Sequence, residues 1–248
     1  TVLRLILLSF HKFPGMKKLL FLSLFYLCSC GSANKLKKYY TVEDKTVFDL
    51  IEKLQKNSND KDATDQLPNA YTTVLLKRQQ LTEANYTYLS PGDRYVELAK
   101  EWGVMQQMYD KIYPLAAIRS QLKNLWNPAE AIQKAKLSAA GEFYNQGLEF
   151  LNYDNKQAAS KVYDLFVKAE KAVPDYKDVA ELKREALEKA TIKVVIKPVG
   201  YSRYSWNYWG YQNDWLQQQI VNDLNAQSYR DVRFYTDWSA GTSQINPD

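Results

Sequence analysis

Residues 90–112 read SPGDRYVELAKEWGVMQQMYDKI and contain the clearest periodic pattern of the chain. Large apolar side chains recur there at alternating steps of three and four, a spacing that places them on one face of an α-helix. The opening Ser-Pro-Gly-Asp indicates a turn before that helix. The pattern therefore predicts one long helix with a core-facing seam made of Tyr95, Leu98, Trp102, Met105, Tyr109 and Ile112.

The helical period extends over residues 42–190, which we expect to form a helical domain. An apolar stripe on the first helix consists of Val47, Leu50, Ile51 and Leu54. A second helical stretch covers residues 62–80, where Pro68 is expected to kink the helix or reset its start. Residues 127–130, Asn-Pro-Ala-Glu, combine an N-cap, a proline at the first helical position and a glutamate three residues after the cap. They predict the start of another helix.

One segment of this domain shows a paired-helix pattern. It places Phe143, Gly147 and Phe150 on one helix and Phe166, Ala169 and Pro174 on the next. This pattern resembles one tetratricopeptide-type repeat, a family in which small residues let two helices pack closely. The spacing departs from the family pattern, because the loop at residues 152–156 is about three residues longer. The resemblance implies that Pro174-Asp175 closes the hairpin before a further helix near Asp178. It also implies an irregular array of helical hairpins, and a closed helical bundle stays the alternative.

At Thr191 the period changes from helical to two. The first alternating run contains Ile192, Val194 and Ile196, and a later one contains Val232, Phe234 and Thr236. Leu216, Ile220 and Leu224 line up on a helix between the two runs. Strand, helix and strand in this order predict a βαβ crossover with parallel strands. Because two strands alone do not make a stable sheet, we expect residues 191–248 to be part of an α/β domain that continues beyond residue 248.

Residues 201–215 are the densest aromatic stretch of the chain. Their aromatic members are Tyr201, Tyr204, Trp206, Tyr208, Trp209, Tyr211 and Trp215. Aromatic rings stack on sugars and anchor protein partners, so these residues are candidates for partner or glycan binding. The favoured interpretation is that they pack the α/β region against the helices, since large aromatic side chains are usually mostly buried.

The N-terminal residues have the pattern of an export signal. Lys17 and Lys18 precede nine mostly apolar residues at 19–27, and Leu27-Cys28-Ser29-Cys30 follows. Nine residues span about 14 Å as a helix, which is too short for roughly 30 Å of bilayer hydrocarbon. The pattern resembles a bacterial lipoprotein signal that ends in a lipobox. The resemblance implies cleavage before Cys30 and acylation of this residue, for example with palmitate; a cleaved signal without lipid stays the alternative.

This signal sets the expected organisation of the N-terminal part. We interpret residues 1–15 as translated upstream sequence, residues 16–29 as the signal peptide and residues 30–41 as a lipidated tether. Lysines and tyrosines at residues 35–40 favour a position near a bilayer surface, although a plain solvated linker is an equal alternative. In lipoproteins that this signal resembles, the residue after the cysteine directs sorting. Gly31 at this place implies the outer membrane. An acidic run after the cysteine sends some lipoproteins to the cell surface, and this chain has none there, which favours the periplasmic side.

Removal of residues 1–29 leaves a nearly neutral chain. The whole sequence has 33 basic and 28 acidic residues. The removed part carries four basic residues and no acidic ones, which leaves 29 basic residues against 28 acidic ones. A nucleic-acid-binding protein keeps a concentrated basic face, so we expect no nucleic-acid partner.

The mature chain also lacks the residues of several kinds of reaction centre. The only histidine, His11, lies in the removed part, and the thiol of Cys30 is expected to be acylated. Histidine-dependent hydrolases and zinc sites built from histidine and cysteine are therefore excluded, and no glycine spacing indicates a nucleotide loop. We expect no catalytic residue, metal or cofactor. Asp93, Glu97 and Glu101 could supply a glycosidase pair, but we interpret them as a solvated stripe on one helix face.

Together these observations predict a non-enzymatic lipoprotein that is anchored in the outer membrane and faces the periplasm. It would act as a scaffold or adaptor in an envelope protein assembly, with the membrane and envelope proteins as partners. The second hypothesis is a cell-wall or glycan-binding lipoprotein that holds peptidoglycan or another glycan at residues 201–215. The third is a carboxylate-dependent glycan hydrolase.

Cys30→Ala should move the protein from the detergent phase to the soluble fraction, because stable membrane anchoring needs more than one acyl chain. Cys28→Ala is the control, since Cys28 precedes the expected cleavage point. Detergent-phase partitioning of both variants measures the effect. Unchanged partitioning of the Cys30 variant would contradict lipidation at this residue.

Overall fold

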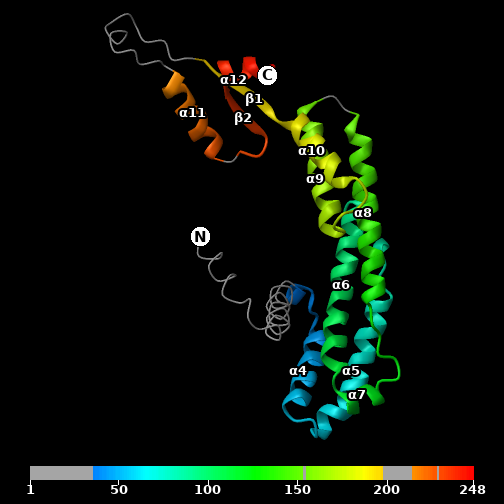
Figure 1. The fold of residues 1–248 in the computed structure, drawn as a ribbon. Coiled ribbons are helices and arrows are strands. Elements are labelled where there is room, and N and C mark those ends of the chain that lie inside the picture. The colour runs from blue at the N-terminus through cyan, green and yellow to red at the C-terminus, as the bar shows by residue number, and fades with distance from the viewer. Residues whose placement is uncertain (1–35, 153–154, 198–213, 228) are drawn as a thin grey trace, which may run out of the picture. The chain divides into compact units, whose positions relative to one another are not determined.

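The computed structural model of the protein describes residues 36–152, 155–197, 214–227 and 229–248 (Figure 1). The described part is mostly helical and has a small two-stranded parallel sheet near the C-terminus. This confirms the predicted order of a helical region followed by a βαβ module. The chain divides into two compact units, Thr1–Ala135 and Lys136–Asp248, and the division lies within helix α8 (Ala129–Leu151).

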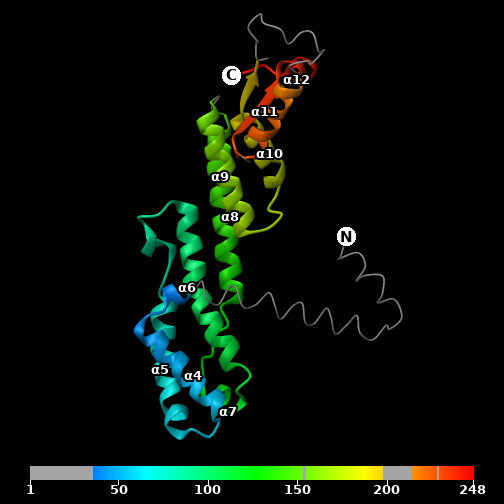
Figure 2. The same cartoon turned by 90° about the vertical axis from the view of Figure 1, so that its left-hand side faces the viewer.

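The N-terminal unit is a packed group of helices. Its elements are η1 (Lys37–Tyr39), α4 (Val42–Lys56), α5 (Lys61–Gln79), η2 (Glu83–Tyr86), α6 (Pro91–Ile112) and α7 (Ala116–Gln121), where η denotes a 3-10 turn. Helices α4, α5 and α6 pack against one another, as Figures 1 and 2 show from two sides. Their shared core includes Val47, Ile51, Leu54, Leu67, Tyr71, Val74, Met105, Met108 and Ile112.

Side-chain caps fix the starts of these helices. Thr41 and Asp44 form a reciprocal capping box at α4, and Asp60 accepts a hydrogen bond from the third residue of α5. Helix α5 then runs through Pro68, so the start is not reset at this proline. Proline cannot make the backbone hydrogen bond of this turn, but the neighbouring Leu67 is fully buried, so the turn packs in the core.

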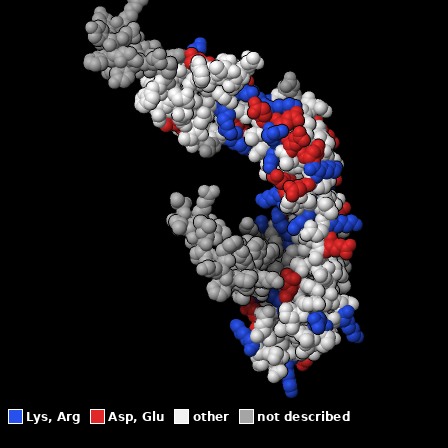
Figure 3. Space-filling model, viewed as in Figure 1, with Lys and Arg blue, Asp and Glu red and all other residues white. Residues whose placement is uncertain are grey.

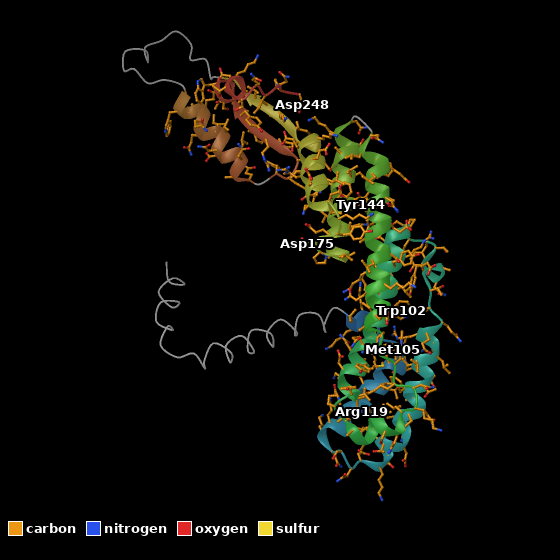
Figure 4. The ribbon with its side chains drawn as sticks, turned by 45° about the vertical axis from the view of Figure 1, so that its right-hand side comes forward. Trp102, Met105, Arg119, Tyr144, Asp175 and Asp248 are labelled. Atoms are coloured by element: carbon orange, nitrogen blue, oxygen red, sulfur yellow. The ribbon has the colours of Figure 1, made fainter. Side chains whose placement is uncertain are left out.

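The predicted seam lies on α6, where Figure 4 places Trp102 and Met105. Leu98 and Met105 are buried as predicted, whereas Trp102 is only half-buried. The indole N–H of Trp102 donates to the carbonyl oxygen of Arg78 at 3.1 Å, and the ring meets Trp126 edge-on at 6.1 Å between centroids. An indole N–H that is shielded from water needs an acceptor, and the apolar centre of the core offers none. The ring of Trp102 therefore lies at the edge of the core, where the carbonyl oxygen of Arg78 is within reach.

The C-terminal unit contains the end of α8, then α9 (Lys156–Ala172) and α10 (Val179–Ala190). Its buried side chains include Phe143, Val162, Phe166, Ala169, Val179 and Ala186. Gly147 of α8 lies directly against the ring of Phe166 from α9. A Cβ atom at position 147 would stand 2.6 Å from Cε1 of Phe166. The two helices therefore approach so closely that only glycine fits without a shift of the ring.

The loop between α9 and α10 closes the hairpin where Pro174 and Asp175 predicted it. Asp175 and Lys177 adopt positive φ angles of 56° and 48°, which produce the tight reversal. Tyr176 from this loop meets Tyr144 of α8 edge-on at 5.9 Å, and the ammonium of Lys177 lies 4.3 Å from the centre of the Tyr144 ring. The loop is thus packed on α8, near the labelled Tyr144 and Asp175 in Figure 4.

The sheet follows α10 directly, because α10 ends at Ala190 and β1 (Ile192–Ile196) begins two residues later. Strand β2 (Val232–Thr236) pairs with β1 in parallel, with Ile192 opposite Val232. Helix α11 (Asp214–Ala226) connects the strands in sequence and packs on β2, and α12 (Asp237–Thr242) follows β2. This arrangement confirms the predicted βαβ crossover and the change of period at Thr191.

Polar contacts attach the start of the sheet to α9, and the last residue of the chain covers one edge of β1. They join Arg230 to Asp164 at 2.7 Å, Ser160 to Asp231 at 3.2 Å and Lys156 Nζ to the carbonyl oxygen of Thr191 at 2.5 Å. Along the edge of β1 that does not pair with β2, the backbone N–H of Asp248 donates to the carbonyl oxygen of Lys193 at 3.2 Å. Two strands are only marginally stable by themselves, so these contacts help to hold the sheet in place.

Gly147→Ala should destabilise the C-terminal unit, because the new methyl group collides with the buried Phe166 ring. Overpacking of a core costs about 1–3 kcal/mol, which exceeds the roughly 1 kcal/mol that alanine gains over glycine in a helix. Gly241→Ala is the matched control, because nothing lies within 4 Å of a Cβ built there. Thermal unfolding followed by circular dichroism should show a lower Tm for the first variant only. An equal or higher Tm for Gly147→Ala would contradict the close approach of α8 and α9.

Candidate functional site

Only one of the predicted aromatic site residues falls within the described part of the chain. Cys30 and residues 201–211 lie outside the described residues. Trp215 lies in the first turn of α11, and it is 73% exposed. Its side chain therefore does not pack the α/β region against helices, which was the favoured interpretation for this stretch.

Trp238 is a second exposed tryptophan, which the sequence reasoning missed. It lies in the first turn of α12 and is 75% exposed. The signal was present in the sequence Thr236-Asp237-Trp238-Ser239, because Thr236 and Ser239 form a capping box that starts a helix directly after the strand. A tryptophan two residues after such a cap lies at the end of the strand, where binding residues of α/β folds occur.

A buried amide joins the starts of α11 and α12. Nε2 of Gln217 donates to the carbonyl oxygen of Ile196 at 2.5 Å and to Oδ1 of Asp237 at 2.9 Å. Ile196 is the last residue of β1, and Asp237 follows the last residue of β2. Gln217 thus ties both helix starts to the carboxyl ends of the two parallel strands. Trp215 lies two residues before Gln217, and Trp238 lies one residue after Asp237.

We call Trp215 and Trp238, with the Gln217 to Asp237 bond, the tryptophan edge. In open α/β sheets, ligands bind outside the carboxyl ends of the strands. The edge offers two large apolar rings on short helices whose starts are fixed by hydrogen bonds. Rings of this kind suit the binding of a protein or a sugar, because they supply large contact area with few rotatable bonds.

The N-terminal unit contains a different cluster, which is centred on Arg78. This residue is buried, with 4% of its surface exposed. Its guanidinium donates to both carboxylate oxygens of Asp44, at 2.5 and 3.3 Å. It also donates to the carboxylate of Glu101, to the carbonyl oxygen of Glu101 at 2.9 Å and to that of Tyr39 at 3.0 Å. These bonds use all five N–H donors of the guanidinium. Arg78 thus joins η1, α4 and α6 to α5 and has no donor left for a bound anion.

The predicted solvated stripe of acidic residues on α6 is wrong for two of its three members. Glu97 accepts hydrogen bonds from the hydroxyl of Tyr39 at 2.6 Å and from Nζ of Lys100 at 2.5 Å, and Glu101 pairs with Arg78. Asp93 belongs to the cap of α6, where it accepts from the hydroxyl of Ser90. The prediction failed because Tyr39 of η1 and Arg78 of α5 reach these two carboxylates of α6, which helical periodicity alone does not reveal.

The pKa values of the cluster reflect this partial burial. Burial raises the pKa of Glu101 in spite of the neighbouring Arg78. Burial acts in the same direction on Glu97, but hydrogen bonds from Lys100 and Tyr39 outweigh it and lower the pKa of that carboxyl group. Burial raises the pKa of Tyr86 to about 12. Glu97 and Glu101 are therefore shifted in opposite directions, while each is already engaged by a cation.

A cavity of about 240 Å³ adjoins the cluster and is lined by Thr41, Asp44, Val74, Lys77, Arg78, Leu81, Tyr86 and Glu101. A glycosidase pair would need two carboxyl groups that face a substrate across such a cavity. Here both carboxylates on its wall, Asp44 and Glu101, hold the same guanidinium. The geometry is that of a structural ion-pair cluster that joins α4, α5 and α6.

Within the described residues, no group of three or more histidine, cysteine, aspartate or glutamate side chains could hold a metal ion. In the same part of the chain, no helix is both long and apolar enough to cross a bilayer. Comparison of the chain with protein-family models, with curated proteins and with solved structures found no match in any of the three.

Arg78→Met should strongly destabilise the N-terminal unit, because it leaves the fully buried carboxylate of Asp44 without a cation. Breaking a buried pair in this way costs about 3–5 kcal/mol. Lys77→Met is the matched control: the neighbouring pair of Lys77 with Glu43 spans the same two helices, but its side chains are 60% and 43% exposed. Exposed pairs contribute little, so the control should unfold almost like the parent.

Urea denaturation of both variants measures the difference in unfolding free energy. An equally small loss of unfolding free energy in both variants would show that the ion pairs of Arg78 do not hold this unit together. Replacing Asp44 and Glu101 by leucine in the Arg78→Met background removes the uncompensated charges and should recover part of the loss.

Proposed function

We propose that the protein is a lipoprotein of the outer membrane that faces the periplasm and works as a non-enzymatic adaptor in an envelope protein assembly. Acylation of Cys30 would anchor it, and the tryptophan edge would bind the partner protein. The observation on which the proposal rests is the exposure of Trp215 and Trp238, both above 70%, on two helix starts that Gln217 holds together.

Exposed tryptophans of this kind favour a protein partner. Large apolar side chains in contact with water cost free energy, which burial in an interface recovers. Tryptophan is also among the residues that most often dominate the binding energy of interfaces. Trp215 lies two residues before Gln217 and Trp238 one residue after its partner Asp237, so the two rings would form the centre of a contact patch, with the polar side chains of both helices around it.

The charge pattern agrees with a protein partner better than with nucleic acid. On the face shown in Figure 3, basic and acidic side chains alternate over the region of α9 and α10. Lys183 pairs with Glu170 at 2.5 Å, and Lys189 pairs with Glu185 at 2.8 Å in this region. A surface that neutralises its own charges has little left to attract phosphates.

We further propose that α8, α9 and α10 form tetratricopeptide-like hairpins that position the tryptophan edge. The close approach at Gly147 and the packed reversal at Asp175 support this, because such hairpins depend on small residues between their helices. Rigid helical hairpins are commonly used to display binding surfaces.

Glycan binding is the second candidate, and the same residues support it, because tryptophan rings stack on the faces of sugars. Hydrolysis of a glycan is less well supported. Glu97 pairs with Lys100 and Glu101 pairs with Arg78, so neither carboxylate is free to act on a bound sugar.

Photo-crosslinking in the native cell tests the adaptor role. A photoreactive phenylalanine analogue at position 215 or 238 should form adducts with a discrete envelope protein, because both positions would lie inside the contact patch. The same analogue at Tyr113, which is 49% exposed in the N-terminal unit, is the control and should not form this adduct.

Two outcomes would contradict the adaptor role. One is the absence of any protein adduct at both tryptophan positions. The other is saturable binding of purified peptidoglycan that Trp215→Ala abolishes without a change in Tm, which would establish the glycan-binding alternative.

A further inference from the structure

Residues 36–40 do not form a free tether but are docked on α6. Leu36 lies against Gly103, where a Cβ atom would stand 3.1 Å from its Cδ1. The hydroxyl of Tyr39 donates to Glu97 at 2.6 Å, and that of Tyr40 donates to Gln107 at 2.5 Å. Contacts at Glu97, Gly103 and Gln107 of α6 thus hold this segment.

Contacts with α4 and α5 add to this docking. The ring of Tyr40 stacks on Phe48 with centroids 4.6 Å apart. The carbonyl oxygen of Tyr39 accepts from the buried guanidinium of Arg78 at 3.0 Å. The chain is therefore part of the folded unit from residue 36 onward, before α4 begins at Val42.

The docking shortens the distance that separates the unit from a lipid at Cys30. Six Cα-to-Cα steps join Cys30 to Leu36, and a fully extended chain of this length reaches about 20 Å. A tether that stayed free as far as Thr41 would reach roughly 37 Å. With Cys30 at the surface of the bilayer, the start of α4 cannot move far from the lipid headgroups.

The surface at this place has the composition of a membrane-contact surface. Lys37, Lys38, Val42 and Lys45 lie within nine residues of the chain at the entry to α4, and we call them the α4 entry surface. All four side chains are exposed, and Val42 is 77% exposed. Val42 and Lys45 lie three residues apart, on the same face of α4.

The charge of this surface is positive. Among the residues that the structure describes, Lys37, Lys38 and Lys45 form no ion pair. The acidic residues in the first turn of α4 are neutralised, since Glu43 pairs with Lys77 and Asp44 with Arg78. Two further acidic side chains lie near: Asp49, one turn beyond Lys45, is exposed, and Glu97, which the charge of Lys38 reaches, already pairs with Lys100.

We propose that the α4 entry surface lies against an anionic lipid bilayer, held there by the lipid on Cys30 and by the docking of residues 36–40 on α6. The inference rests on the proposed lipidation of Cys30. Lysines near an anionic bilayer surface are attracted to it within about one Debye length, and the exposed valine can enter the headgroup region. The protein would then sit directly on the membrane with a fixed orientation of its N-terminal unit.

The test uses lipidated full-length protein on vesicles that contain phosphatidylglycerol and brominated lipids. A single fluorescent label is attached at Val42→Cys or, as the control, at Ser58→Cys, which is an exposed position in the turn after α4. Acylation of Cys30 leaves the introduced thiol as the reactive one. Bromine quenching should be several-fold stronger at position 42 than at position 58.

Charge variants test the electrostatic part. Reversal of the three lysines to glutamate should remove the excess quenching at position 42, because each lysine changes the contact equilibrium by about five-fold. Reversal of Lys53, Lys56 and Lys61, which are exposed near the other end of α4, is the matched control and should leave it in place. Phosphatidylcholine vesicles should give the same loss as the first set.

The outcomes separate this inference from the proposed function. Protein that does not partition into vesicles at all would overturn lipidation of Cys30 and thus the proposed anchoring. Protein that partitions but shows equal quenching at positions 42 and 58 would overturn only the contact of the α4 entry surface with the bilayer. Excess quenching that survives reversal of its three lysines would also overturn it.

Discussion

The buried guanidinium of Arg78 is the interaction on which the N-terminal unit depends. A buried cation is tolerated only where every donor has an acceptor, and here α4, α6 and η1 all contribute acceptors to a residue of α5. Asp44 has two roles, because it also forms the capping box with Thr41 at the start of α4. The position of α4, the docking of residues 36–40 and the edge of the core at Trp102 are therefore linked through one residue, by the side chain of Arg78 and by its carbonyl oxygen.

The C-terminal unit depends on close packing instead of charge. Gly147 and Phe166 set the distance between α8 and α9, and the loop around Asp175 fixes α10 beside them. The sheet begins two residues after α10 and is tied to α9 by Arg230. A pair of strands with little core of its own is in this way stabilised by its attachment to a helical hairpin, and the tryptophan edge gains a fixed support.

Helical periodicity and the change to a period of two predicted the order of elements well, because these patterns report which face of each element is buried. Leu98 and Met105, the βαβ crossover and the turn at Asp175 were predicted from neighbouring residues alone. Trp102 shows the limit of such reasoning, since its place at the edge of the core depends on an acceptor 24 residues away in sequence.

The candidate site was less predictable for the same reason. Trp215 was singled out by local aromatic density, but its exposure depends on how α11 packs on β2. The engagement of Glu97 depends on Tyr39, 58 residues away in sequence, and that of Glu101 depends on Arg78, 23 residues away. Trp238 followed a recognisable capping signal, yet its closeness to α11 arises only through the bond between Gln217 and Asp237.

Hydrogen exchange of residues 36–48 most directly tests whether the segment before α4 belongs to the folded unit. The backbone N–H of Tyr40 donates to the carbonyl oxygen of Lys37, and that of Thr41 donates to the carboxylate of Asp44. We expect both amides to exchange as slowly as those in the first half of α4, and to lose this protection together with α4 in Arg78→Met. Exchange of Tyr40 and Thr41 at the rate of an unstructured peptide, beside a protected α4, would contradict the docked segment.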